Sequence, residues 1–243
     1  EIGKPNANII FVHRKLKNNG GYMVLAFILS HAFRLIITIT FFAILINKKT
    51  PLLVNDKFTP LQIESIKKNV HFTNKIILPT KTNQLHYNIK LDQQFFLLSS
   101  GSTGEYKIIV HHFNNILEHL KMFNSFFNPK KNETYLLNLP LYHVSGLMLF
   151  FRSFLNFSKI KTTFDEKKID YLSLVPSQLE VIFKSKQENI IETLSKAKGV
   201  FVGGANLNHD LKNKLSANKI SFYETYGMTE TLSFICLNNK ILN

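Results

Sequence analysis

The decisive stretch runs from Phe95 to Lys107 and reads FFLLSSGSTGEYK. It opens with a short apolar run, typical of a buried strand, and continues with six small or hydroxyl-bearing residues before Glu105, Tyr106 and Lys107. Glycines let the backbone approach a ligand closely, and backbone N–H groups together with hydroxyls can surround phosphate oxygens. The Gly-Lys-Ser/Thr ending of a Walker loop is absent. The stretch therefore predicts a phosphate-binding loop, with a flexible Ser/Gly turn as the alternative.

The composition is that of a folded globular protein. The chain has 243 residues, of which 45% are hydrophobic and 19% are charged. Its net charge of +14 is compatible with nucleic-acid binding. The lysines are scattered rather than gathered in a block, however, so we expect no nucleic-acid partner. The single cysteine, Cys236, excludes an internal disulfide and fits a cytoplasmic location.

Strand-like and helix-like segments alternate along the chain. The predicted strands are Phe95–Leu98, Tyr135–Leu139, Tyr171–Val175, Gly199–Val202 and, as the last strand, Ile220–Tyr223. The predicted helices are Thr59–Lys68 (capped by Thr59), Phe113–Phe126, Leu147–Leu155, Ser177–Lys184 and His209–Leu215. This alternation predicts the α/β class, with mainly parallel sheets and flanking helices. In such sheets ligands bind beyond the carboxyl ends of the strands.

One segment, Tyr22–Ile46, is almost continuously apolar and long enough to span a bilayer. A membrane span would place Arg34 in the hydrocarbon at a cost of roughly 3 kcal/mol. The segment also divides into a strand at Tyr22–Leu29 and a helix at Phe33–Ile46, followed by a strand at Pro51–Val54. We therefore expect a buried crossover without stable membrane insertion, and a membrane span remains the alternative.

Two further segments have the chemistry of a nucleotide site. Tyr223–Glu230 reads YETYGMTE, which offers an aromatic ring for a purine, a hydroxyl for a phosphate and a carboxylate for Mg²⁺. The alternative is a strand followed by a capped helix start. The run Gly203-Gly204-Ala205 follows a predicted strand, so a flat base can lie on its backbone.

A fourth segment, Leu139–Gly146, reads LPLYHVSG and places His143 just after a predicted strand, where ligands bind in α/β sheets. Arg152 follows in an otherwise apolar helix. If that helix is buried, the arginine needs an anionic partner. The alternatives are an exposed helix face or a structural ion pair.

In this order, the four segments resemble the acyl-adenylate-forming superfamily, which includes acyl-CoA synthetases, luciferases and adenylation domains. The ordered matches run from Phe95 to Cys236. The chain is most similar to the o-succinylbenzoate–CoA ligases of menaquinone synthesis. The runs that carry this closer resemblance are Leu139–Gly146 with Arg152, Leu172–Leu179 and Val202–Leu207. The resemblance implies that residues 1–243 form the large N-terminal, AMP-binding domain of such a ligase, incomplete at both ends.

The resemblance also implies a role for each matched position. The ATP phosphates would be held by Ser99, Ser100, Gly101, Ser102, Thr103, Gly104 and Lys107. The adenosine part would contact Gly203, Gly204, Ala205, Tyr226 and Gly227. Thr229 would contact phosphate and Glu230 would bind Mg²⁺. The acid would lie among His143, Ser145, Gly146 and Arg152, with Ser145 and Arg152 beside its free carboxylate. Direct parts in catalysis would fall to His143, Thr229 and Lys107.

The implied reaction is attack of the acid's carboxylate on the α-phosphorus of ATP, which releases pyrophosphate. The thiolate of coenzyme A then displaces AMP, which gives o-succinylbenzoyl-CoA. The expected cofactors are ATP, Mg²⁺ and coenzyme A. The alternatives are another acyl-CoA synthetase or a catalytically impaired nucleotide-binding fragment.

The chain departs from the family pattern at two places. Tyr106 stands where the family nearly always has proline. The chain also stops soon after Glu230, before the family's ribose-binding aspartate, hinge and small C-terminal domain with its adenylation lysine. We therefore expect the 243-residue chain to bind nucleotide and to show negligible ligase activity by itself. Its expected protein partner is either a separate C-terminal domain chain or a second copy in a homodimer.

Overall fold

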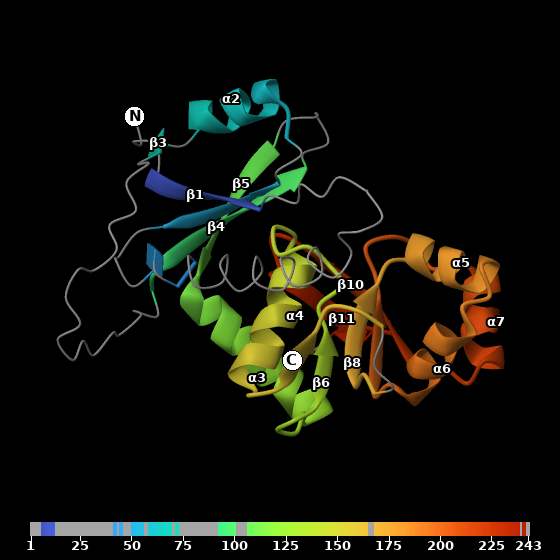
Figure 1. Ribbon diagram of the computed structural model, residues 1–243. Coiled ribbons are helices and arrows are strands. Elements are labelled where there is room, and N and C mark those ends of the chain that lie inside the picture. The colour runs from blue at the N-terminus through green and yellow to red at the C-terminus, as the bar shows by residue number, and fades with distance from the viewer. Residues whose placement is uncertain are drawn as a thin grey trace, which may run out of the picture. The chain divides into compact units, whose positions relative to one another are not determined.

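The computed structural model describes residues 6–12, 41–42, 44–45, 50–55, 58–69, 71–72, 92–100, 106–164, 168–238 and 240–241. The chain divides into two compact units, Glu1–Asn115 and Ile116–Asn243, and Figure 1 labels most of their helices and strands. Most of the segment 22–46 lies outside the described residues, and with it the predicted strand and most of the predicted helix. In the parts that are described, every helix is too short or too polar to cross a membrane.

The first unit contains a five-stranded sheet. Its strand order is β3 (His71–Phe72), β1 (Asn6–Val12), β2 (Pro51–Asn55), β4 (Gln94–Ser100) and β5 (Tyr106–His112). The pairs from β3 to β4 are parallel, whereas β4 and β5 are antiparallel. The predicted strands at Pro51–Val54 and Phe95–Leu98 are confirmed.

Helix α2 (Pro60–Asn69) begins directly after Thr59, the residue that the sequence predicts as its cap. The backbone N–H of Gln62 donates to Thr59 Oγ1 at 3.3 Å, and the backbone N–H of Thr59 donates to Gln62 Oε1 at 2.8 Å. This reciprocal pair is a capping box, which satisfies two backbone donors at the helix start. One turn further on, Ile66 packs with buried side chains of the sheet, namely Leu52, Val54 and Phe96.

The second unit contains a seven-stranded sheet. Its order is β12 (Lys240–Ile241), β11 (Ser233–Leu237), β10 (Phe222–Met228), β9 (Gly199–Val202), β8 (Tyr171–Leu174), β6 (Thr134–Leu136) and β7 (Lys159–Lys161). All pairs from β10 to β7 are parallel, and β11 and β12 add an antiparallel edge. The prediction of mainly parallel sheets is confirmed.

Helices cover both faces of this sheet. They are α3 (Phe113–Phe127), α4 (Val144–Leu155), α5 (Pro176–Lys184), α6 (Glu188–Lys196) and α7 (His209–Ala217). Figure 1 shows α5, α6 and α7 grouped on one side of the strands and α3 and α4 on the other.

The strand residues alternate to match these two layers, because successive side chains of a strand point to opposite faces. Leu172, Val200 and Val202 join the aliphatic core with residues of α5, α6 and α7. Tyr171 and Phe201 face the other way, and each has an edge-to-face ring contact with Phe123 of α3.

The prediction that Ile220–Tyr223 is the last strand is wrong. β10 begins at Phe222 and continues to Met228, and two antiparallel strands follow it. The apolar run after Glu230 therefore forms β11, which pairs with β10 as part of the antiparallel edge of the sheet. The strand predicted at Tyr135–Leu139 is also shorter, because β6 ends at Leu136.

Candidate functional site

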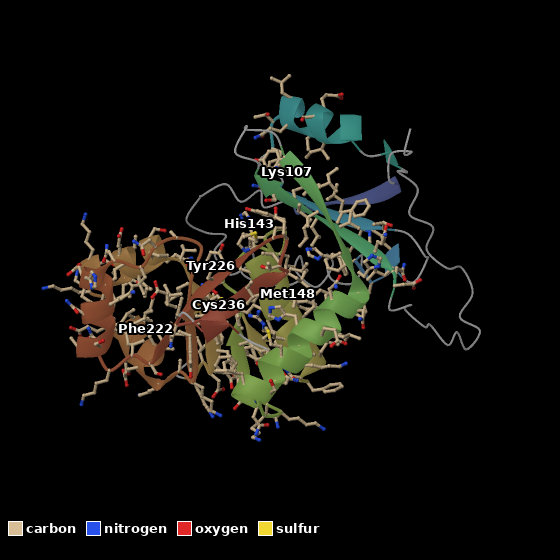
Figure 2. The ribbon with its side chains drawn as sticks, turned by 180° about the vertical axis from the view of Figure 1, so that it is seen from behind. Lys107, His143, Met148, Phe222, Tyr226 and Cys236 are labelled. Carbon is tan, nitrogen blue, oxygen red and sulfur yellow. The ribbon has the colours of Figure 1, made fainter. Side chains whose placement is uncertain are left out.

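The candidate nucleotide segments of the second unit lie at one edge of its sheet. Because β6, β8, β9 and β10 are parallel, their carboxyl ends meet at the same edge. Gly203 directly follows β9, and His143 precedes the helix after β6. In Figure 2, Phe222 marks the start of β10, and His143 lies at the same end of the unit as Tyr226. Three strand spacings separate β6 from β10, which amounts to about 14 Å.

The Gly203–Ala205 turn requires its glycines. A Cβ on Gly203 would lie 2.1 Å from Thr225 Oγ1 and 2.9 Å from the Thr225 carbonyl oxygen. Gly204 has a φ of +83°, a conformation that residues with a side chain rarely adopt. Gly204 and Ala205 are exposed, so the turn presents open backbone to solvent beside the end of β10.

The end of β10 and the following turn carry the next predicted residues. The side chain of Tyr226 is 60% exposed, and Gly227 packs so closely on β11 that a Cβ would lie 2.1 Å from the Ser233 carbonyl oxygen. Thr229 is half-buried and Glu230 is exposed in the turn that leads to β11.

Glu230 offers one exposed carboxylate at this edge. The described residues include no cluster of three or more side chains able to hold a metal ion. Mg²⁺ is usually bound through one or two carboxylates together with phosphates and waters. The single carboxylate therefore fits a metal that arrives with a nucleotide.

The start of α4 is built by close packing against the preceding loop. The backbone N–H of His143 donates to the Pro140 carbonyl oxygen at 3.1 Å. A Cβ on Gly146 would lie 2.2 Å from that same oxygen, so only glycine lets the helix approach this closely. The His143 ring keeps an exposed edge, but partial desolvation lowers its pKa below 6.5, which leaves it neutral at pH 7. Ser145 lies half-buried in the first turn.

Arg152 is the most unusual residue of this unit, since its side chain is only 1% exposed. Its guanidinium carbon lies 5.0 Å from the ring centroid of Phe123 and 4.3 Å from that of Phe234. Its Nη2 donates to Ser233 Oγ at 3.2 Å, and its Nε has no hydrogen-bond partner in the described part of the chain. Burial lowers the pKa of Arg152 to about 9, so the group stays charged at pH 7.

No described Asp or Glu forms an ion pair with this guanidinium. The guanidinium lies near the carboxyl edge of the sheet. Its hydrogen-bond partner Ser233 pairs with Met228, which is the last residue of β10. Ser145 lies seven residues before Arg152, which places both on one face of α4, about 10 Å apart along the helix. Ser145, Gly146 and Arg152 therefore share one helix, whose N-cap is His143; Gly146 and Arg152 are buried, whereas Ser145 is half-buried.

The predicted phosphate loop belongs to the first unit. Ser99 and Ser100 end β4 and pair with Lys107 and Tyr106, the first residues of β5. Lys107 is exposed. The loop residues Gly101, Ser102, Thr103 and Gly104 lie outside the described residues.

The residues that enclose Arg152 were not predicted from the sequence. They are His119, Phe123, Ser233 and Phe234. No motif marks them, and they come from α3 and β11, far from Arg152 along the chain. An apolar helix with one arginine indicates that such partners must exist, but it does not identify them.

Comparison with known proteins gives a consistent result. Residues 46–242 match the protein family described as AMP-binding enzyme. A 2-succinylbenzoate–CoA ligase from Haemophilus influenzae is 34% identical over 144 residues, which are 57% of this chain and 31% of the relative. The matched part of the chain therefore covers about a third of the length of that relative.

Two solved structures share the fold. An E. coli MenE variant with bound OSB-AMS has a TM-score of 0.66 at 19% identity, over 97% of this chain and 52% of the other. The o-succinylbenzoate coenzyme A synthetase (MenE) from Bacillus subtilis, in complex with ATP and magnesium ion, has a TM-score of 0.67 at 15% identity. That match covers 96% of this chain and 51% of the other.

Proposed function

This chain belongs to the family of AMP-binding enzymes, and we propose that its work is to activate a carboxylic acid with ATP. The observation that carries the proposal is the common edge formed by parallel β6, β8, β9 and β10. The glycine turn after β9, the exposed ring of Tyr226 and the neutral His143 all lie at this edge. Ligands of parallel α/β sheets bind at such an edge.

In this proposal the adenine lies between the Gly203–Ala205 backbone and Tyr226, with the exposed backbone of Gly227 beside the ring. The triphosphate contacts Thr229. Within the first unit, the loop Ser99–Lys107 is proposed as a phosphate-binding segment, where Lys107 supplies positive charge. Glu230 holds Mg²⁺, which supplies charge neutralisation to the phosphates when it is bound. Each part stabilises or orients negative charge, which is the main demand of a phosphoryl-centred transfer.

The acid's carboxylate oxygen attacks the α-phosphorus, the bond to the bridging oxygen breaks, and pyrophosphate leaves with its electron pair. The resulting acyl-adenylate then reacts with the thiolate of coenzyme A, which forms the thioester and releases AMP. The neutral ring of His143 lies at the edge where the carboxylate would be oriented, and it adds no competing charge there.

We further propose that the acid carries two carboxylates and is o-succinylbenzoate. Two observations support this choice. Arg152 is a buried cation with no carboxylate partner among the described residues, and a fatty acid would supply none. The relative from H. influenzae bears the corresponding name. A ligand carboxylate would offset the energetic cost of the buried charge.

Equilibrium titration with a fluorescent ATP analogue and Mg²⁺ tests the nucleotide site. The chain should bind saturably, and ATP and AMP should displace the probe. Tyr226→Ala should weaken binding at least about fivefold, because stacking on a base contributes about 1–3 kcal/mol. Phe157→Ala removes another exposed ring, 76% exposed and located beyond α4, and serves as the matched control. Absence of displaceable binding, or equal losses in both variants, would contradict the proposal.

A further inference from the structure

Arg152 is enclosed by four side chains that we call the arginine cage: His119, Phe123, Ser233 and Phe234. The two phenylalanine rings contact the guanidinium through their faces, an attraction that strengthens when the cation is desolvated. Ser233 accepts its hydrogen bond. All four groups are uncharged at neutral pH, so they orient the cation without neutralising it.

His119 connects the two elements that form the arginine cage, α3 and β11. It lies on α3, and its Nε2 is 3.1 Å from the Phe234 carbonyl oxygen on β11. A carbonyl oxygen only accepts, so Nε2 carries the proton and donates. The imidazole also has an edge-to-face contact with the Phe234 ring, at 5.5 Å between centroids. Through these two contacts His119 fixes the ring on which Arg152 lies.

The second ring nitrogen of His119, Nδ1, is a buried hydrogen-bond acceptor without a partner among the described residues. Burial first, and the nearby Arg152 second, lower the pKa of His119 to about 3, so the ring is neutral. With Nε2 protonated, Nδ1 is a bare acceptor. His119 Nδ1, Arg152 Nε (a donor) and the hydroxyl of Tyr135 on β6, which interacts electrostatically with Arg152, are all buried and lack a hydrogen-bond partner among the described residues. The interior around Arg152 thus has unused donors and acceptors.

We infer that His119 is a positioning residue for substrate selection: it holds Phe234 and so fixes the Arg152 guanidinium to receive the second carboxylate of the acid. This inference rests on the proposed function of Arg152. A carboxylate at position 119 would pair with the arginine internally and remove its free charge, whereas a neutral imidazole keeps that charge available. The arginine cage therefore determines the affinity for an acid with a second carboxylate and does not affect the affinity for nucleotide.

The test measures dissociation constants by calorimetry for three ligands: o-succinylbenzoate, 4-oxo-4-phenylbutanoate and Mg-ATP. The second ligand has the same skeleton without the ring carboxylate. His119→Phe keeps a ring but loses both nitrogens, and it should weaken o-succinylbenzoate binding about tenfold. Binding of 4-oxo-4-phenylbutanoate and Mg-ATP should stay within about twofold. His119→Gln can still donate to the Phe234 carbonyl and should restore most of the loss, while His209→Gln on the exposed face of α7 should change nothing.

Equal losses for the two acids, or no loss for either, would overturn the inference. His119→Asn replaces His119→Phe if the latter does not fold, since its shorter amide cannot span to Phe234 and the same tenfold selective loss is expected. Arg152→Gln distinguishes a failure of the positioning role of His119 from a failure of the proposed acid. If Arg152→Gln abolishes the preference for o-succinylbenzoate while His119→Phe leaves it intact, only the positioning role of His119 is wrong. If Arg152→Gln leaves the preference intact, the proposed acid is wrong as well.

Discussion

Replacement of Arg152 by methionine should stabilise the second unit while it removes the acid-binding charge. Methionine has a similar length and no charge to desolvate, and buried ion sites replaced by apolar side chains are often neutral or more stable by about 1–4 kcal/mol. We therefore expect this one substitution to raise the free energy of unfolding and, at the same time, to weaken binding of the acid.

The magnitude follows from the surroundings of the guanidinium. Burial lowers the pKa of Arg152 from 12.5 to about 9, and at 1.36 kcal/mol per pKa unit this corresponds to about 5 kcal/mol. The two ring contacts return about 2 kcal/mol in total, and the charged hydrogen bond to Ser233 returns about 2 kcal/mol. The variant should therefore gain about 1 kcal/mol in free energy of unfolding at pH 7.

The pH dependence gives this prediction a second signature. Between pH 9 and pH 12.5 the unfolded chain keeps a proton on Arg152 that the folded protein has lost. Stability rises with pH wherever the unfolded state binds more protons, so the wild type regains stability above pH 9. Urea unfolding at pH 7, 8, 9 and 10 should show an advantage of about 1 kcal/mol for Arg152→Met at pH 7 and 8, a smaller advantage at pH 9 and none at pH 10, where one pH unit above the folded pKa returns about 1.4 kcal/mol to the wild type. A variant less stable than wild type at pH 7, or an advantage that grows with pH, would show that the buried charge of Arg152 does not destabilise the folded protein.

Three further predictions concern packing and acid stability. Gly146→Ala should lower the free energy of unfolding by about 3 kcal/mol, because its Cβ meets the Pro140 backbone oxygen at 2.2 Å; urea unfolding checks this, and a loss below 1 kcal/mol would contradict it. Gly203→Ala meets the Thr225 hydroxyl at 2.1 Å and the Thr225 backbone oxygen at 2.9 Å, so it should cost about 2–3 kcal/mol and also weaken ATP binding in the same titration; unchanged affinity would contradict the role of the turn as a base platform. The pKa of His119 is about 3 in the folded protein and 6.5 in the unfolded chain, so the free energy of unfolding should fall as the pH drops through this window. His119→Gln should reduce that fall, and identical acid unfolding curves for the wild type and the variant would contradict this prediction.

Local sequence features predicted much of the fold. β9 begins and ends at the predicted residues, because an apolar run is bounded by glycines on the carboxyl side. α2 begins after the predicted cap, since Thr59 and Gln62 make the local hydrogen bonds expected of a capping box. Features of this kind depend on neighbours in sequence, so periodicity and turn chemistry are sufficient to find them.

The missed strands include two that each pair with the strand directly preceding them in the sequence. β5 (Tyr106–His112) mixes apolar and basic residues and β11 (Ser233–Leu237) is a short apolar run, and their strand character comes from antiparallel pairing with β4 and β10. A run of that length is equally compatible with a helix or a loop until its partner is known.

The same distinction applies to the site. The sequence alone indicated that Gly203 and His143 follow strands, and parallel topology then brings them to one edge. The environment of Arg152 depends on contacts with α3 and on Ser233, which lies 81 residues later. Only the packed structure shows that these partners are aromatic and neutral rather than acidic.

The most direct test of the central claim is the choice of acid by the chain saturated with Mg²⁺ and a non-hydrolysable ATP analogue. Calorimetric titrations with o-succinylbenzoate and with hexanoate compare an acid that can supply a second carboxylate with one that cannot. We expect saturable binding of o-succinylbenzoate, binding of hexanoate at least tenfold weaker, and loss of this preference in Arg152→Gln. Equal affinity for the two acids in the wild-type chain, or a preference that survives Arg152→Gln, would contradict the central claim.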